Sequence, residues 1–396
     1  QGVMNAAIWE IIGLNVRVPE MVYGDLRAQM AASHAGRRSF LELVARHGID
    51  DVLACAHELH DYAERLGRAE IRDLPNGTYH FTDHLDGLGE SPEPIVIQIA
   101  LTIHDDTISV DFAGSSPQVK GGVNTPIPFT KASVYTALRS VMLSDVPNCH
   151  GFERVVTVTA PKGTVVNSVH PAPCGARGIT GYRIIDAMFG ALAQALPDRV
   201  TADGMGGSTV PTFAGYEDGR AFVFSETVMG TWGATSAHDG QVGVPHMGAN
   251  QANVPVEMIE ASYPLRIRRY GIVQDTGGAG RHRGGPSFIR EYEYLGETEG
   301  VMSLRSDKRD FLPHGLYGGS EGTGPVNILI RDGIETVLPV LVTQPYAMKK
   351  GDVFRHISPS GGGFGPAAER SEAEVRSDLE AGLISEEVAR RDFGLV

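Results

Sequence analysis

The chain has 396 residues, of which 48 are acidic and 34 are basic, giving a formal charge of −14. Hydrophobic residues make up 42% of it, which is enough for a buried core and too much for a disordered chain. No run approaches the ~20 apolar residues that cross a bilayer. An acidic chain also gains no affinity by releasing DNA counterions. We therefore expect neither a membrane segment nor a nucleic-acid partner.

The numbers of glycine, proline and cysteine residues narrow the class of protein further. The 49 glycines and 23 prolines predict many turns. Three cysteines are too few for a disulfide framework, which favours a reducing, cytoplasmic location. The chain begins at Gln1 without a signal segment, so we expect it to continue a missing N-terminal part.

Residues 1–75 are predicted to form a helical stem. Apolar side chains recur at helical spacing between Tyr23 and His47, and Gly48 fits the C-cap of that helix. Asp50 can cap a second helix, which ends near the turn signal at 74–77.

Residues 76–365 are predicted to form a β-rich body. Alternating apolar side chains at 97–103 and 108–112 predict a hairpin that turns at Asp105-Asp106. Asp-Gly pairs at 218–219 and 332–333 are typical of hairpin turns. The other expected elements are strands at 155–160, 286–295, 301–304 and 326–330, and helices at 130–142 and 179–196.

The helix expected at 179–196 is apolar on nearly all sides, so the body should bury it. After residue 365 the sequence becomes charged, and residues 366–396 are predicted to form a tail of two short surface helices. The expected fold is α+β, with a helical stem, a large β-rich body around the buried helix, and a short helical tail.

Candidate functional side chains gather in one polar, glycine-flanked stretch. These groups could hold a metal or orient a carbonyl, but their spacing matches no standard zinc pattern. A loop that faces substrate, or a structural loop, is the favoured interpretation. The residues are His238, Asp239, His246, Asn250 and Asn253.

Three further residues admit both a functional and a structural interpretation. Glu226 ends a strand-like run and is either a base or a solvated strand end. Arg177 precedes the buried helix and either holds an anion or forms a salt bridge. Cys174 lies beside the same helix end, but no partner can be assigned to it, so packing is favoured over nucleophilic catalysis.

Two glycine runs and one His-Asp pair carry weaker signals. The run 361–365 lacks the Lys-Ser/Thr that completes a phosphate loop, so a flexible turn is expected there. The run 277–280 precedes Arg281 and Arg283, and turns with exposed arginines explain it as well as phosphate binding does. Residues 80 and 83 (His and Asp) should lie on opposite faces of a strand and form no metal pair.

Taken in order, several segments resemble the hydantoinase B/oxoprolinase family. The likeness extends over essentially the whole chain, and its specificity comes from the order and combined coverage of the pieces. They are Asn15–Glu20, Gly24–Gln29, Leu74–Tyr79, Asp111–Gln118, Asn253–Glu257, Gly277–Arg281, Gly361–Gly365 and Ala389–Gly394.

This resemblance implies a B-type subunit of a two-component, ATP-dependent enzyme. A hydantoinase A-like subunit with an actin-like ATPase fold would use ATP and Mg²⁺ to phosphorylate the small-molecule substrate. The B-type subunit would complete ring opening of hydantoin, 5-oxoproline or a lactam. On this interpretation His246 and Asn250 orient the carbonyl or water, Glu226 acts as a base, and four residues contact substrate: His238, Asp239, Asn253 and Arg177.

The chain departs from the family pattern in two places. A Gly-Gly-Thr-His-x-x-Asp metal motif should precede its first residue, so a divalent metal (Mn or Zn) is expected on a missing N-terminal segment or separate chain, and no metal ligand is assigned here. A family loop of the type His-Met-Thr-Asn-Thr reads His246-Met247-Gly248-Ala249-Asn250.

Two alternative functions stay open. Relatives carboxylate acetone or acetophenone, so the chain could belong to a ketone carboxylase. It could also be a non-catalytic scaffold, in which case disturbing the stem around Phe40 or Leu53 should abolish assembly.

Overall fold

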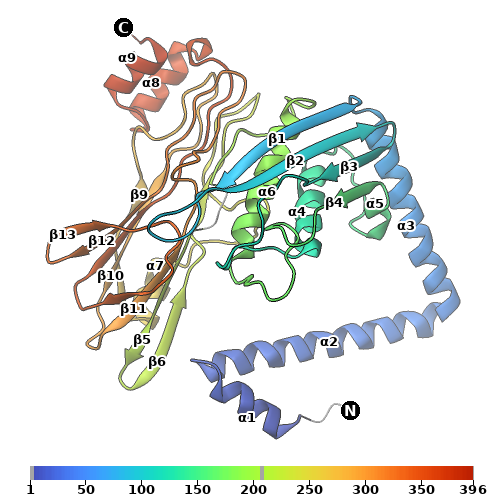
Figure 1. Cartoon of the computed structure of the whole chain (residues 1–396), viewed down its shortest axis with the longest axis horizontal. Helices are drawn as coiled ribbons and strands as arrows, with labels where there is room; N and C mark the ends of the chain where they lie inside the picture. Colours follow the sequence, from blue (N-terminus) through green and yellow to red (C-terminus); the bar gives the residue numbers. More distant parts are fainter. Residues whose placement is uncertain (1–3, 206–208, 396) are drawn as a thin grey trace.

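The computed structural model describes residues 4–205 and 209–395, so the chain start at Gln1 lies outside the described part. Figure 1 shows a helical stem, a body of β-sheets around one central helix, and a small helical tail. The fold is therefore α+β, as the sequence predicts. Within the described residues, no helix is long and apolar enough to span a membrane.

The stem consists of three helices: α1 (Ala6–Leu14), α2 (Pro19–His47) and α3 (Ile49–Arg72). Gly48 joins α2 to α3 at φ +82°, and its N–H donates to the carbonyl of Val44, which confirms the predicted C-cap. Gly48 also occupies the N-cap of α3, so Asp50 lies inside the first turn. The prediction that Asp50 caps this helix was wrong; Asp50 instead lies in the first turn, where the helix dipole favours an acidic side chain.

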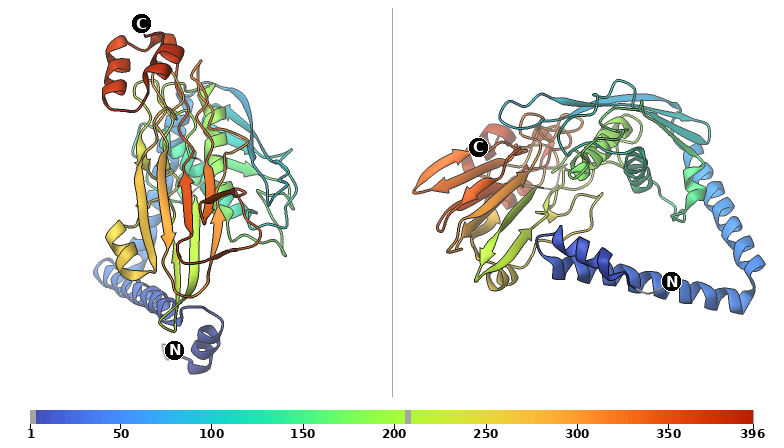
Figure 2. Two further views of the ribbon diagram at one scale, coloured as in Figure 1. Left: turned by 90° about the vertical axis from the view of Figure 1, so that its left-hand side faces the viewer. Right: turned by 60° about the horizontal axis from the view of Figure 1, so that its bottom comes forward.

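The stem is attached to the body mainly through the second half of α3. There Ala63, Gly67 and Ile71 are buried, beside α5 (His150–Glu153), whereas α2 buries none of its residues. Figure 2 shows α2 crossing back toward β6 apart from the sheets along most of its length. Residues 14–25 then face Val223 and Tyr263 across a hollow of about 990 Å³.

The first sheet follows the stem and has the order β1-β2-β3-β4. Its first three strands are antiparallel, and β4 pairs with β3 in parallel. The alternating side chains Ile97 to Ile103 point into the core, and Asp105 turns the hairpin at φ +50°, as predicted. The strands are β1 (Gly77–Leu85), β2 (Ile95–His104), β3 (Thr107–Asp111) and β4 (Val156–Thr159).

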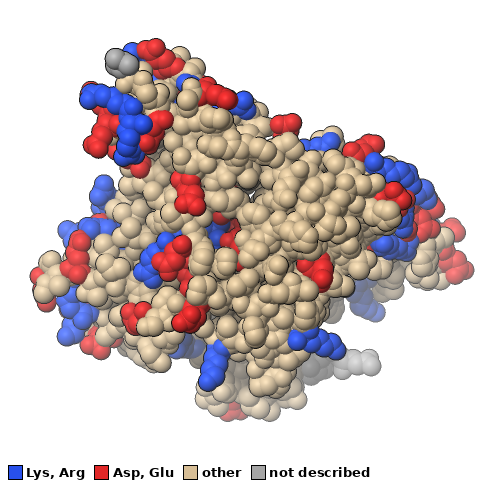
Figure 3. All heavy atoms as spheres, turned by 45° about the horizontal axis from the view of Figure 1, so that its top comes forward, with Lys and Arg blue, Asp and Glu red and all other residues tan. Residues whose placement is uncertain are grey.

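Two helices cover the inner face of this sheet: α4 (Ile127–Ser140) and α6 (Arg177–Ala193). In α6 every residue from Ile179 to Ala193 except Tyr182 is buried, which confirms the predicted central helix. The outer face carries neutral polar side chains such as Thr78, Thr82 and Gln98. Figure 3 accordingly shows a broad surface with few charges between the tail and the far end of α3.

The rest of the body is a β-sandwich. One sheet has the order β14-β11-β5-β6 and the other β13-β12-β15-β10-β9. Aromatic side chains from both sheets, among them Phe213, Tyr292 and Phe354, form its core. The strands are β5 (Val210–Glu217), β6 (Arg220–Ser225), β9 (Leu265–Ile272), β10 (Phe288–Tyr294), β11 (Gly300–Arg305), β12 (Val326–Arg331), β13 (Ile334–Val337), β14 (Tyr346–Met348) and β15 (Val353–Ile357).

The Asp-Gly pairs at 218–219 and 332–333 join β5 to β6 and β12 to β13, with positive φ at all four residues. This geometry is that of the type I′ turn and confirms both predicted hairpins. Two small elements complete the body: the ribbon β7–β8 (Gly230–Thr231 and Val242–Val244) and the helix α7 (Val256–Ser262).

The glycine run at 361–365 is buried, so the flexible turn expected there was wrong. Its backbone lies directly against other extended segments: Gly361 donates to the carbonyl of Gly285, and Gly362 donates to that of Asp203. A Cβ on Gly361 would lie 2.2 Å from the carbonyl oxygen of Trp232. Glycine is needed here because main chain packs on main chain without side chains between them.

The tail consists of η1 (Ala367–Glu369), α8 (Glu372–Glu380) and α9 (Glu386–Phe393), in agreement with the predicted pair of short helices. Arg283 is buried against Asp378 of α8 and is not the exposed turn arginine that was expected. Arg370 also bonds to Asp378. These charge-assisted contacts hold the tail on the sandwich.

We predict that Gly361→Ala lowers the free energy of unfolding by about 1–3 kcal/mol or more, because the backbone around its Cβ cannot move aside. Urea denaturation of the purified chain measures this. Gly271→Ala is the matched control, since a Cβ there meets nothing within 4 Å. Equal stability of the two variants would contradict the packing explanation.

Candidate functional site

A network of buried charges lies where α6 meets the first sheet and the sandwich. At its centre is Arg183 of α6, which is fully buried. Its Nη2 lies 2.7 Å from Oδ2 of Asp307, and its Nη1 lies 3.2 Å from Oδ1 of Asp83. Asp83 belongs to β1 and Asp307 follows β11, so a single guanidinium connects three parts of the fold.

A second buried cation continues the network. Lys308 has no exposed surface, and its Nζ lies 3.0 Å from Oδ2 of Asp186 and also contacts Asp203. The backbone of Lys308 has φ +72°, a strained conformation for a residue with a side chain. Such strain persists only where the surroundings hold the residue in place, and here two carboxylates do so.

Burial and neighbouring charges both shift the pKa values of the carboxyl groups in this network. Burial raises the pKa of Asp83. Burial would raise that of Asp203 as well, but Lys308 and His314 outweigh it and hold the pKa of Asp203 well below its usual range. For Asp86, burial and the neighbouring charge of Asp307 raise the pKa to about 6. Carboxyl groups thus outnumber the basic side chains Arg183 and Lys308 in this network, and the pKa values of Asp83 and Asp203 are shifted in opposite directions.

His246 lies at one end of the network. Its Nε2 is 3.1 Å from Oδ1 of Asp186, and its Nδ1 accepts the N–H of Gly248 at 3.0 Å. A neutral ring with its proton on Nε2 satisfies both contacts. An imidazole held this way by a buried carboxylate can accept a proton at its other nitrogen, provided that Nδ1 releases the Gly248 amide.

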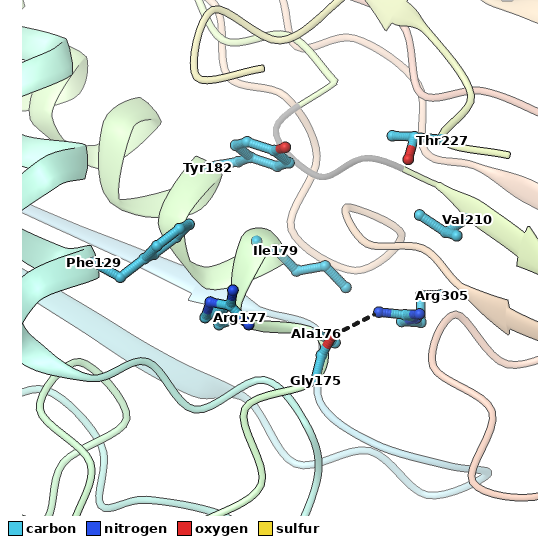
Figure 4. A pocket seen from close by; sticks show the side chains of 10 residues that line it. Phe129, Gly175, Ala176, Arg177, Ile179, Tyr182, Val210, Thr227 and Arg305 are labelled. Carbon is cyan, nitrogen blue, oxygen red and sulfur yellow. Dashed lines mark hydrogen bonds between the residues drawn. The ribbon is translucent and has the colours of Figure 1, made fainter. Parts of the chain in front are cut away.

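Small hollows flank α6 near this histidine. One of about 20 Å³ is lined by Asp186, Trp232 and His246 and has room for about one water molecule. A larger one of about 240 Å³ lies at the start of α6 and is lined by Arg177, Tyr182 and Arg305, among others (Figure 4). The ring of Tyr182 packs on that of His246 with centroids 4.5 Å apart, so these two side chains separate the hollows.

Glu226 lies in a different environment from His246. It is only 2% exposed, and its oxygens accept from the hydroxyl of Tyr292 and the amide of Val254, beside Arg290. It is therefore neither the solvated strand end nor an accessible base. Burial raises the pKa of Glu226, and its contacts connect β6 to β10 and to the segment before α7.

The other predicted residues do not converge on one point either. Asp239 forms a bidentate ion pair with Arg370 of the tail. Asn253 accepts the amide of Met229 and donates to the hydroxyl of Tyr270. His238 and Asn250 are exposed. The predicted site residues are thus divided among separate places, with His246 at the ion network, Asp239 at the tail, and Arg177 at the pocket in Figure 4.

The network itself was the part that sequence reasoning missed. Asp83 faces inward and His80 outward, as strand geometry predicts, but the inward carboxylate was passed over. The available signals were a charged pair, Arg183 and Asp186, inside an otherwise apolar helix, and the acidic-basic pair 307–308 directly after a strand. A charged side chain in an element that is certain to be buried requires an oppositely charged or hydrogen-bonding partner.

Within residues 4–205 and 209–395, no group of three or more His, Cys, Asp or Glu side chains is arranged to hold a metal. The buried carboxylates of Asp307, Asp186 and Asp203 bind Arg183 and Lys308 instead. The divalent metal implied by the resemblance therefore does not fit the described residues, and we derive no step through it.

The chain belongs to the hydantoinase B/oxoprolinase family, because the sequence model of that family matches residues 1–367. A putative B-type component of the D-/L-hydantoinase of Pseudomonas sp. (strain NS671) is 34% identical to it; the match covers 100% of this chain and 68% of that protein. The resemblance inferred from the sequence is thereby confirmed.

Two solved structures share the fold. The crystal structure of an ATP-dependent caprolactamase from Pseudomonas jessenii matches with a TM-score of 0.89 and 29% identity, over 100% of this chain and 70% of that one. The nucleotide-free structure of an acetone carboxylase matches with a TM-score of 0.88 and 17% identity, over 100% of this chain and 59% of that one. The second likeness shows the fold alone.

We predict that His314 stabilises the chain more in acid than in base. Burial alone would lower the pKa of His314, but the carboxylate of Asp203, whose Oδ2 lies 3.4 Å from Nδ1 of the ring, raises it above the ordinary 6.5. Because the pKa of His314 is higher in the folded chain than in the unfolded chain, its protonated form stabilises the fold. This stabilisation is fully present below the pKa of the unfolded chain and is lost as the pH rises through the pKa of the folded chain. His314→Gln should therefore cost more stability at about pH 5.5 than at about pH 9. Urea denaturation at the two pH values measures the difference, and an equal cost at both would refute this assignment.

Proposed function

We propose that this chain is part of the B-type subunit of an ATP-dependent enzyme that opens cyclic amides such as hydantoin, 5-oxoproline or a lactam. The observation that carries the proposal is the family match over nearly the whole chain. Relatives named for hydantoinase and caprolactamase activity support it, since both act on ring amides. The free cysteines Cys55, Cys149 and Cys174 support a reducing, cytoplasmic setting.

We further propose that the reaction is divided between components. A hydantoinase A-like ATPase subunit would bind ATP and Mg²⁺ and phosphorylate the ring carbonyl oxygen. A divalent metal, Mn or Zn, would lie on the segment or chain that carries the histidine motif. Support for a multi-component enzyme comes from the names of the hydantoinase and caprolactamase relatives, which are those of subunits.

In this chain we assign the proton-transfer role to His246. Its ring is oriented by Asp186, and Asp186 is in turn held by Lys308, so the imidazole has a fixed position without being fully enclosed. Phosphorylation of the carbonyl oxygen makes the ring carbon a better electrophile. A positioned base then has only to take a proton from the attacking water.

The direct experiment is reconstitution of this chain with the ATPase subunit and the metal-bearing part. Release of ADP and of the ring-opened acid is followed with hydantoin, 5-oxoproline and caprolactam. One ring-opened product per ADP is the expected result. ATP consumption that needs bicarbonate and a ketone would assign a carboxylase instead.

We predict that His246→Ala slows ring opening by the assembled enzyme by about 10²–10⁴-fold, because a positioned proton acceptor is lost. Product formation at saturating ATP measures this. His104→Ala, an exposed histidine at the end of β2, is the matched control. Near-normal turnover in the His246 variant would remove the assignment and favour the scaffold alternative.

The stem provides an independent test of subunit assembly. Phe40 of α2 and Leu53 of α3 are each 48% exposed, and both helices expose further large apolar side chains. Isolated long helices gain most of their stability from burying such a face.

We predict that Phe40→Asp weakens association with the rest of the complex by roughly tenfold or more, because an apolar contact is replaced by a charge. The melting temperature of the isolated chain should change little, since α2, which carries Phe40, buries none of its residues within this chain. Native mass spectrometry counts the assembled fraction. Full assembly of the variant would show that this face of the stem makes no essential contact.

A further inference from the structure

Two neighbouring hollows meet at the side chain of Arg305. The pocket of about 240 Å³ in Figure 4 adjoins a second hollow of about 420 Å³, and both are lined by Gly175, Ala176 and Arg305. Lys120 lines the second hollow and Arg177 the first. Three cations from separate segments of the chain thus border these two adjoining hollows, which are together called the depression below.

Acidic side chains are missing from this lining. Among the described residues, neither hollow is lined by an Asp or a Glu. Lys120 and Arg177 are exposed and Arg305 is partly buried, and among the described residues they form no ion pair, whereas the buried Arg183, Lys308 and Arg370 each bind a carboxylate.

The two guanidiniums have most of their donors unused. Arg305 donates from Nη1 to the carbonyl of Gly175 at 2.9 Å, and Arg177 donates from Nη1 to that of Cys174 at 3.3 Å. These are the only hydrogen bonds that the two side chains make within residues 4–205 and 209–395. Each guanidinium carries five N–H donors, so most of them face the depression or solvent.

The position of Arg177 adds an electrostatic cost. It stands in the first turn of α6, where the helix dipole disfavours a cation, and its guanidinium lies over the ring of Phe129 at 5.6 Å. Arg305 stands on the other side of Gly175–Ala176 in Figure 4. An anion bound beside Arg177 would offset the unfavourable interaction of this cation with the helix dipole.

We propose that this depression, bordered by Lys120, Arg177 and Arg305, binds a phosphoryl group. Guanidinium forks match the oxygens of a phosphoryl dianion, and a lysine adds a third positive charge. The inference deepens the proposed function and rests on it for the source of the ligand. ATP-dependent activation gives two sources, the phosphorylated ring and the inorganic phosphate released later.

The test uses inorganic phosphate and the full chain, without its partners. Phosphorus-31 NMR line broadening is followed as protein is added at low salt. Saturable binding is expected for the unmodified chain, with at least about tenfold weaker binding for Arg305→Gln and for Arg177→Gln. Arg220→Gln, at the exposed start of β6, is the matched control and should bind normally.

The folding of each variant is measured together with its phosphate binding, so that an unfolded variant is not mistaken for one that has lost the site. Circular dichroism and the melting temperature should be unchanged for Arg177→Gln, whose side chain is exposed. Equal phosphate binding by the unmodified chain and all three variants would overturn the proposal. The absence of saturable phosphate binding by the unmodified chain would overturn it as well. Neither outcome depends on ring opening, so a failure of the phosphoryl site and a failure of the proposed function can be distinguished.

The assembled enzyme distinguishes the two sources. If the depression holds the phosphorylated ring, Arg305→Gln should release ADP without a matching amount of ring-opened product. If it holds released phosphate, the variant should keep that ratio and lose inhibition by added phosphate. Either result supports a phosphoryl site, and a variant with unchanged coupling and unchanged inhibition would contradict it.

Discussion

The rest of the structure depends on the buried ion pairs of Arg183 and Lys308. These two cations bind carboxylates from β1, from α6, from the segment after α6, and from the segment after β11. The first sheet and the sandwich therefore meet through charges and not only through apolar packing. Isolated buried charges are costly, so this contact between the first sheet and the sandwich is stable only when every ion-pair partner is in place.

The ion network also explains why His246 differs from the other polar residues of its loop. Asp186 holds Lys308 with one oxygen and His246 with the other. The segment around residue 246 is otherwise a partly exposed loop, and loops seldom fix a side chain on their own. The network thus supplies the rigidity, while Tyr182 lies between this histidine and the arginine-lined pocket.

Local sequence signals predicted the elements of the fold well, because their causes are local. Helical spacing gave α2 and α6, Asp-Gly pairs gave two type I′ turns, and alternation gave the first hairpin. The site could be predicted only in part. Lys308 meets Asp203 across 105 residues and Asp86 meets Asp307 across 221, and no periodicity encodes such pairings. The buried glycine run at 361–365 was missed for the same reason, since its partners lie elsewhere in the chain.

The most direct test of this account is the free energy of unfolding of Lys308→Met. This variant keeps an apolar side chain of similar length but leaves Asp186 and Asp203 without their shared cation. The account predicts a loss of about 3–5 kcal/mol relative to the unmodified chain. It also predicts faster amide exchange in α6 and around His246. Lys349→Met, at an exposed lysine after β14, should change neither quantity. Equal stability of the two variants would contradict the claim that buried charges join the halves of this fold.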